Sequence, residues 1–369
     1  MDVAKLRAWY SHKQGLDGRL AGSTAAQVME QTGWIRSLGS PTPYLALHAR
    51  AGISRKAADA AVAQLQIHEL PVVRGCMYVL PKSDFALGLA AGLLAPDSEL
   101  KTAAKLGVTE KEIAKLCDAV GKALEKDALD PEQIRQAVGA AARSLGEEGK
   151  KKGLSSTLPL ALGQLQSRGE IRRVPVDGRL DQQRFRYTLW KPNPLAKFRM
   201  AAEDVHVELA RRYFKWIGPA TIAQFLTFAG ISVKAAKAAA ETVGLVAVEK
   251  GAESLLLAED AEKFQRFQTP KTPQYALAGS IDGIALFRRD LGSMVDAADA
   301  GAMAGKGGAR GDLPRHPILD RGRIVGLWDY DPKKQAIEWT TFVKKNGELE
   351  QAVARTETFV RDELGAARC

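Results

Sequence analysis

A seven-residue pattern that occurs twice constrains the fold of this chain more than any other feature. Residues 52–58 (GISRKAA) and 230–236 (GISVKAA) are identical at six of seven positions. In each copy a glycine suits a tight turn, and the serine is a good N-cap for an Ala-rich helix. A strand-like run follows, at residues 72–80 and 244–249. We interpret the pattern as an internal repeat of two helices and a short β-hairpin, with common helix-start chemistry as the alternative.

The second copy, residues 217–249, shows the whole arrangement. Pro219 suits the first turn of one helix, Gly230 suits the turn, and Ser232 suits the start of the next helix. A helix-turn-helix followed by a two-stranded wing is a winged helix, whose second helix commonly lies in the DNA major groove. Lys234 and Lys237 share nearly one face of that helix. We therefore predict that both lysines contact DNA.

Similar patterns divide the chain into four parts. We predict an α+β fold of three tandem winged-helix units, residues 1–95, 96–195 and 196–270, followed by a small β-barrel-like C-terminal domain, residues 271–369. Within these parts we expect a helix at residues 25–36, a mobile stretch at 147–153, and a final helix at 349–364. The glycine-rich loop at 305–308 lacks the spacing of a phosphate-binding P-loop.

The net charge and the cysteine content indicate which kind of partner the protein binds and in which cellular compartment it works. The chain has 53 Lys and Arg against 43 Asp and Glu, a net charge of +10, which favours a polyanionic partner. Its 3 cysteines are too few and too scattered for a disulfide framework or a metal site. The sequence shows neither a signal peptide nor an apolar run of membrane-spanning length. We expect a cytoplasmic, nucleoid-associated monomer that needs no cofactor or metal and contacts no membrane.

Basic residues of the first two units are the remaining predicted DNA contacts. In the first unit they are Arg36, Arg50, Arg55, Lys56 and Arg74. The second unit ends in a hairpin around Asp177 and Gly178, whose strands carry Arg172, Arg173, Arg184 and Arg186, with Arg179 in the turn and with Phe185 and Tyr187 between the arginines. Cations interleaved with aromatic rings are typical of a nucleic-acid grip. The alternative is an edge ribbon protected by its charge.

Six short segments, which follow one another in the order known from one protein family, carry a resemblance to that family. They are residues 41–50 with 74–79, residues 212–214 with 218–221, residues 228–230, and residues 317–328. With them the chain resembles the AlkZ/YcaQ-like winged-helix DNA glycosylases over nearly its whole length. The resemblance implies a monofunctional enzyme that removes alkylated or crosslinked bases from double-stranded DNA without a metal.

The catalytic pair of that family is missing from this sequence. The resemblance implies a Gln-x-Gln or Gln-x-Asp pair after the first long helix, and alignment through Gly33 and Arg50 places Ile35 and Ser37 there. Cleavage of an N-glycosidic bond builds positive charge on the sugar, which preorganised polar groups stabilise. We therefore predict Trp34, Ser37 and Glu30 as the catalytic candidates.

Two further hypotheses remain open. The positive charge of Arg36 beside the expected pocket would destabilise the sugar cation that forms during base excision. This favours a non-catalytic DNA-binding protein or transcriptional regulator on the same scaffold. A protein-interaction scaffold would instead bind its partner without dependence on salt. Asp282 is a possible general base, although an aspartate that caps a turn is the better interpretation.

Overall fold

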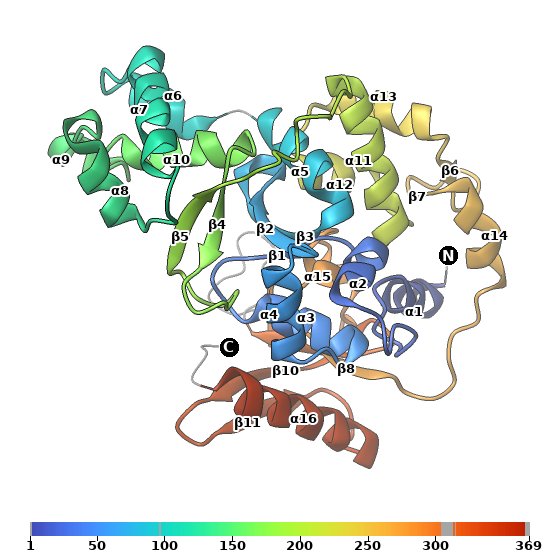
Figure 1. Cartoon of the computed structure of the whole chain (residues 1–369). Helices are drawn as coiled ribbons and strands as arrows, with labels where there is room; N and C mark the ends of the chain where they lie inside the picture. The colour runs from blue at the N-terminus through green and yellow to red at the C-terminus, as the bar shows by residue number, and fades with distance from the viewer. Residues whose placement is uncertain (1, 96, 304–312, 314, 366–369) are drawn as a thin grey trace.

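The computed structural model describes residues 2–95, 97–303, 313 and 315–365, so the glycine-rich loop at 305–308 lies outside the described residues. The fold is mixed α+β, with small antiparallel sheets distributed among many helices (Figure 1). No helix within the described ranges is long and apolar enough to cross a membrane.

The first part of the chain places a three-stranded sheet among short helices. Its elements are α1 (Val3–Lys13), α2 (Ala25–Thr32), β1 (Ile35–Arg36), α3 (Thr42–Ala51), α4 (Arg55–Ala63), β2 (Ile67–Pro71), β3 (Met77–Pro81) and α5 (Phe85–Leu93). The sheet has the order β1-β3-β2 and is antiparallel throughout. The expected helix at 25–36 is thus too long, because α2 ends at Gly33, whose φ of +105° is unfavourable for other residues. The residues after Gly33 form a strand instead.

The second part is a helical unit with a long hairpin. It contains α6 (Ser98–Ala104), α7 (Glu110–Ala123), α8 (Pro131–Val138), α9 (Gly146–Lys151), α10 (Leu158–Ser167), β4 (Ile171–Pro175) and β5 (Phe185–Leu189). Asp130 caps α8 as the sequence predicts, by accepting a hydrogen bond of 2.9 Å from the Gln133 amide. The stretch expected to be mobile forms α9. A hydrophobic core of its own, including Leu116, Ile134 and Leu165, holds the unit together.

The third part contains the second copy of the repeat. Its elements are α11 (Ala202–Ile217), α12 (Ile222–Ala229), α13 (Val233–Val243), β6 (Val246–Ala247), β7 (Leu255–Leu256) and α14 (Ala258–Arg266). The two copies have the same local structure. Gly52 and Gly230 end α3 and α12 at φ values of 67° and 72°, and Ser54 and Ser232 each accept a hydrogen bond of 3.2 Å from the amide three residues later.

One pairing recurs in all three parts. In each, a residue between two helices (α2 and α3, α7 and α8, α11 and α12) pairs with the last strand of the following hairpin: Ile35 with Val79, Leu129 with Tyr187, and Ala220 with Leu255. The order helix, extended residue, helix, helix and hairpin therefore occurs in the first and third parts, and the second part has the same order with α9 as an additional helix.

The C-terminal part is a sheet covered by a helix. It contains β8 (Tyr275–Leu277), α15 (Gly283–Leu286), β9 (His316–Asp320), β10 (Arg323–Asp331), β11 (Ala336–Thr341), α16 (Gly347–Phe359) and a π-helical turn (Val360–Leu364). The strand order is β11-β10-β9-β8. The expectation of a β-barrel is not confirmed, because within the described residues the two outer strands, β8 and β11, do not pair and the sheet stays open.

Two hydrophobic cores join distant parts of the chain. Trp34 and Tyr78 of the first part pack with Trp216 and Phe228 of the third, and the Trp34 and Trp216 ring centroids lie 5.4 Å apart. A second core joins the other side of the first part to the C-terminal sheet and α16. The first part therefore lies between the third part and the C-terminal sheet, with the second part at one side (Figure 1).

Candidate functional site

A cleft of about 750 Å³ opens between the first and second parts of the chain. The first part contributes residues 37–39 after β1, Glu69 of β2 and Met77 of β3. The second part contributes residues 130–132 at the start of α8 and several residues of the β4–β5 hairpin. This is a concave space of the size of small-molecule binding sites, with both charged and aromatic lining.

Glu69 is the most deeply buried charged group of the cleft. Its exposed fraction is 7 %, and burial raises the pKa of its carboxyl, while the Ser37 hydroxyl and the charges of Arg173 and Arg36 act in the opposite direction. Arg173 Nη1 lies 3.7 Å from Glu69 Oε2, longer than a good charged hydrogen bond. Neither Glu69 Oε2 nor Ser37 Oγ has a well-formed hydrogen bond to any described residue. A carboxylate and a hydroxyl are therefore buried side by side in the lining of the cleft.

The loop that carries Ser37 is braced from both sides. The Ser37 amide donates a hydrogen bond of 3.1 Å to the Met77 carbonyl, and Gln183 Nε2 donates one of 3.0 Å to the Leu38 carbonyl. Gly39 has a φ of +64°, and a Cβ there would lie 2.3 Å from Gln183 Cγ, so the close approach requires glycine. The Leu38 side chain is 51 % exposed at the edge of the cleft. The bracing holds Ser37 in place beside Glu69.

Arginines and aromatic rings form the hairpin wall of the cleft. The Arg173 guanidinium lies over the rings of Phe185 and Tyr187, with its central carbon 4.9 and 6.0 Å from their centroids. Arg184 and Arg186 are exposed, and Arg184 lines the cleft. This wall combines free cations with stacking surface.

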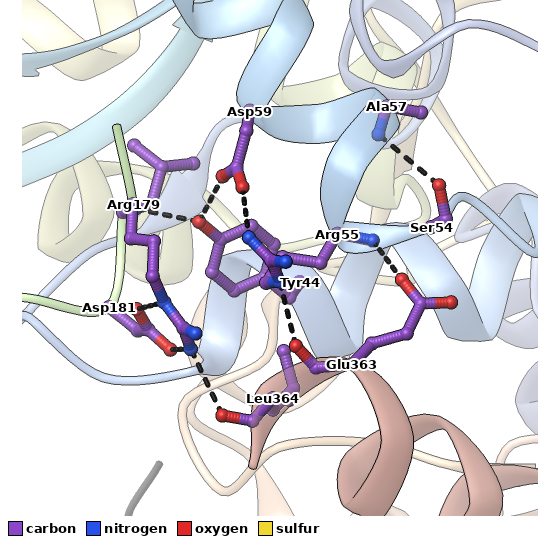
Figure 2. Close-up of polar contacts among 10 residues, drawn as sticks. Tyr44, Ser54, Arg55, Ala57, Asp59, Arg179, Asp181, Glu363 and Leu364 are labelled. Carbon is purple, nitrogen blue, oxygen red and sulfur yellow. Dashed lines mark hydrogen bonds and ion pairs between the residues drawn. The ribbon is translucent and has the colours of Figure 1, made fainter. Parts of the chain in front are cut away.

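A hydrogen-bond network fastens the turn of this hairpin to the first part of the chain (Figure 2). The Tyr44 hydroxyl of α3 accepts a hydrogen bond of 2.7 Å from the Leu180 amide in the turn. The same hydroxyl donates one of 2.5 Å to Asp59 Oδ1 of α4. Burial raises the pKa of Tyr44, so the hydroxyl remains a donor. The helix-turn-helix of the first part thus positions the hairpin that walls the cleft.

The C-terminal π-helical turn completes the network (Figure 2). The Arg55 amide donates a hydrogen bond of 2.5 Å to the Glu363 carboxylate, and Arg55 Nε donates one of 2.7 Å to the Glu363 carbonyl. Arg179 pairs with Asp181 and donates a hydrogen bond of 3.1 Å to the Leu364 carbonyl. Arg55 and Arg179 are therefore engaged within the protein.

Of the three catalytic candidates predicted from the sequence, only Ser37 lines the cleft. Trp34 is 1 % exposed in the core, and its Nε1 donates a hydrogen bond of 2.8 Å to Asp84 Oδ2. Glu30, in the last turn of α2, accepts a hydrogen bond of 2.8 Å from Ser83 Oγ and is not part of the cleft lining. In this conformation Trp34 and Glu30 do not reach a substrate in the cleft.

Arg50 has a different environment from the one expected. Its side chain is 3 % exposed, and Nη2 and Nη1 pair with the two carboxylate oxygens of Asp282 at 2.6 and 2.8 Å. Asp282 also caps α15 by accepting a hydrogen bond of 3.0 Å from the Ile284 amide. We therefore remove Arg50 from the predicted DNA contacts, because its guanidinium is enclosed. The capping interpretation of Asp282 is confirmed.

The other predicted DNA contacts differ in exposure. Lys56, Lys234 and Lys237 are exposed on α4 and α13, as are Arg184 and Arg186 on the hairpin. The remaining members are partly covered: Arg36 lies against the Tyr78 ring, Arg74 lies against Gly230, and Arg172 and Arg173 are on β4. The five exposed cations are the accessible members of the predicted set.

Glu69 is the residue that sequence reasoning missed. It lies in the run Ile-His-Glu-Leu-Pro at residues 67–71, where a charged residue interrupts an apolar strand. A carboxylate in such a run is rarely fully buried without a partner, so this interruption was the available signal. The residues that enclose Glu69 come from β1 and from β4, which are far from it in sequence.

Comparisons with known proteins agree with this architecture. The model of a family described as DNA glycosylase AlkZ-like matches residues 24–359. Among solved structures, the chain is similar to the Streptomyces sahachiroi DNA glycosylase AlkZ, with a TM-score of 0.74 and 19 % sequence identity over 100 % of this chain and 98 % of that one. No curated protein sequence is significantly similar. Since the family model spans most of the described residues and the fold agrees along the entire length, this chain belongs to the AlkZ-like DNA glycosylase family.

Proposed function

We propose that this protein is a DNA-repair glycosylase that binds double-stranded DNA and excises alkylated bases in the cleft between its first and second parts. The observation that carries the proposal is the chemistry of that cleft: a desolvated carboxylate with a serine hydroxyl beside it, next to a wall of arginines and aromatic rings. Membership of a DNA glycosylase family supports the same reaction class.

The proposal includes three winged helices, at residues 1–95, 96–195 and 196–270. The order of helix, extended residue, two helices and hairpin in the first and third units, and the same order with the additional helix α9 in the second, supports this assignment. The second helix of each helix-turn-helix segment carries exposed lysines, Lys56 on α4 and Lys234 and Lys237 on α13. The hairpin of the remaining unit carries the exposed Arg184 and Arg186. Cations on recognition helices and wings are suited to phosphate contacts. We infer that these cations hold a duplex across the mouth of the cleft. We also infer that the protein acts as a monomer at the nucleoid.

The cleft suits the transition state of base excision. Breaking an N-glycosidic bond generates a cationic sugar, which a nearby carboxylate stabilises in a site of low dielectric constant. An N7-alkylated purine is already cationic and leaves as a neutral base, so it needs little acid assistance. Phe185, which is partly exposed in this wall, offers a stacking surface for an unstacked base.

The absence of the Gln pair favours a second candidate, a non-catalytic DNA-binding protein or transcriptional regulator on the same scaffold. Ile35 occupies the first position of the pair and is 6 % exposed in an apolar core, so it offers no polar group to a substrate. This candidate keeps DNA binding and loses base release.

The test is to incubate the protein with a duplex that carries N7-methylguanine and to count abasic sites after alkali treatment. The matched unmodified duplex and heat-inactivated protein are the controls, and binding is titrated at two salt concentrations. Release above the spontaneous rate supports the glycosylase. Salt-sensitive binding without release supports the non-catalytic candidate. Absence of salt-dependent DNA binding would contradict both and favour a protein-interaction scaffold.

A further inference from the structure

We propose that Glu69 is the catalytic carboxylate of this protein and that, with Ser37, it holds the water that attacks the sugar of an alkylated purine nucleotide. The inference rests on the proposed glycosylase function. It adds the group that performs the step in place of the missing Gln pair.

The strand register places Glu69 on the same side of the sheet as the two positions of the missing pair. Ile35 of β1 is opposite Val79 of β3, and Val79 is opposite Glu69 of β2. Directly opposed residues point to the same face, and so do alternate residues of one strand. Ser37 follows β1, and its amide hydrogen bond to the Met77 carbonyl continues the pairing with β3, so Ile35, Ser37 and Glu69 share a face. The Glu69 carboxylate on β2 can therefore act in the same space that the missing pair at positions 35 and 37 would occupy.

The polar atoms of this face are not saturated by the protein. Glu69 Oε2 and Ser37 Oγ are both buried, both residues line the cleft, and the Ser37 hydroxyl lies near enough to the Glu69 carboxyl to lower its pKa. Buried polar atoms normally have partners, and apart from each other and the Arg173 guanidinium at 3.7 Å these two have none among the described residues, which indicates a ligand-binding role. A carboxylate oxygen accepts a hydrogen bond from water, and a serine hydroxyl can accept a second or donate one. Together they can orient one water molecule.

The reaction balances with this carboxylate as general base. The water oxygen forms a bond to C1′ while the bond from C1′ to N9 breaks, and that electron pair passes to the purine ring. The N7-alkylated purine, cationic before the step, leaves neutral. The water proton passes to the Glu69 carboxylate and then to solvent, and the product is an abasic site with a hydroxyl on C1′. During bond cleavage the negative charge also stabilises the cationic sugar.

The charges around Glu69 determine the expected pH dependence. The charges that act on it are Arg173 on β4 and, from the other face of the sheet, Arg36 on β1, while Asp130 and Glu132 at the start of α8 line the same cleft. The preceding residue, His68, has a pKa lowered to about 3 by burial and by Arg172, so its ring is neutral where Glu69 titrates. Burial raises the Glu69 pKa. Excision should therefore increase with pH as the Glu69 carboxyl loses its proton.

The experiment measures single-turnover excision of N7-methylguanine from a duplex at saturating protein, for the wild type, Glu69→Gln, Ser37→Ala and Glu125→Gln. Glu69→Gln should lower the rate by roughly 10²–10⁴-fold, the usual contribution of a general base, with the duplex Kd changed less than about twofold. Ser37→Ala should lower it less, because the carboxylate remains. Glu125, exposed in the bend after α7 and outside the cleft, is the matched control, and Glu125→Gln should leave the rate unchanged.

The pH profile separates a chemical role from a structural one. The wild-type rate should rise with pH through the ionisation of one carboxyl group, and the residual rate of Glu69→Gln should lack that rise. Should Glu69→Gln fail to fold, the wild-type profile still decides: a rate that does not change with pH where a carboxyl group ionises would overturn the assignment. A folded Glu69→Gln protein with the wild-type rate would overturn it while leaving the glycosylase intact. A wild type that binds DNA and releases no base overturns the glycosylase and this assignment together.

Discussion

The buried ion pair between Arg50 and Asp282 should contribute to folding and not to DNA binding. The two side chains are 3 % and 0 % exposed, and the pair is bidentate. Arg50 also donates hydrogen bonds to Gln14 Oε1 at 3.0 Å and to the Ala46 carbonyl at 3.1 Å. Arg50→Met preserves much of the volume but leaves the Asp282 carboxylate buried without its partner. Breaking a buried pair in this way costs about 3–5 kcal/mol, a large part of the free energy of unfolding of a typical protein.

Urea denaturation followed by tryptophan fluorescence measures this loss. Lys56→Met, which removes an exposed cation on the next helix, is the matched control and should change the free energy of unfolding by less than about 0.5 kcal/mol. The double variant Arg50→Met with Asp282→Asn should recover part of the loss, because the amide keeps a cap on α15 without the charge.

DNA binding supplies the complementary readout. For folded Arg50→Met, the dependence of log K on log salt should equal that of the wild type, because the guanidinium does not reach a phosphate. A midpoint equal to that of the wild type, or a salt slope reduced by about 1 as for a lost phosphate contact, would refute the structural role of Arg50.

Three further predictions concern the cleft and its hairpin wall. The folded state holds the Glu69 proton more tightly than the unfolded state, where the ordinary pKa is 4.5. The free energy of unfolding should therefore decrease as pH rises from that value through the raised pKa of the folded state. Over this pH range the urea midpoint of Glu69→Gln should fall less than that of the wild type. Tyr44→Phe should cost about 1–3 kcal/mol by leaving the hairpin amide unsatisfied, and hydrogen exchange should become faster in the hairpin turn; unchanged protection there would count against the network. Arg184→Ala with Arg186→Ala should reduce the salt slope of duplex binding by about 2, measured by fluorescence anisotropy, whereas Lys122→Ala on α7 should not; equal slopes in all three proteins would exclude the hairpin as a DNA grip.

Elements defined by their own residues were predictable from the sequence. The two helix-turn-helix segments follow from Gly52 with Ser54 and from Gly230 with Ser232, since each cap acts within three residues. The β4–β5 hairpin follows likewise from a turn around Gly178, whose φ is +71°. The prediction of a helix at 25–36 was wrong at its C-terminal end, where Gly33 packs against a residue far away in sequence: a Cβ on Gly33 would lie 2.5 Å from Phe287 Cε2. Neighbouring residues in the sequence indicate neither the conformation of this glycine nor the strand that follows it.

The roles of individual side chains depended on partners far away in the chain. Nothing near Trp34 in sequence distinguishes a catalytic ring from a core ring, and its burial is determined by Trp216 and Phe228. Glu69 became a candidate only because β1 and the β4–β5 hairpin enclose it.

Capping, turn and repeat chemistry act over a few residues, so the sequence alone determined the recurring helix-turn-helix and hairpin segments, the basic character of the chain and the family resemblance. Burial and charge pairing are properties of the assembled fold, and only the tertiary structure decided which cations are free. Arg50 meets Asp282 across 232 positions of sequence and is enclosed, whereas Lys56 stays in solvent. The same long-range packing desolvates Glu69 and leaves its carboxylate facing a cleft.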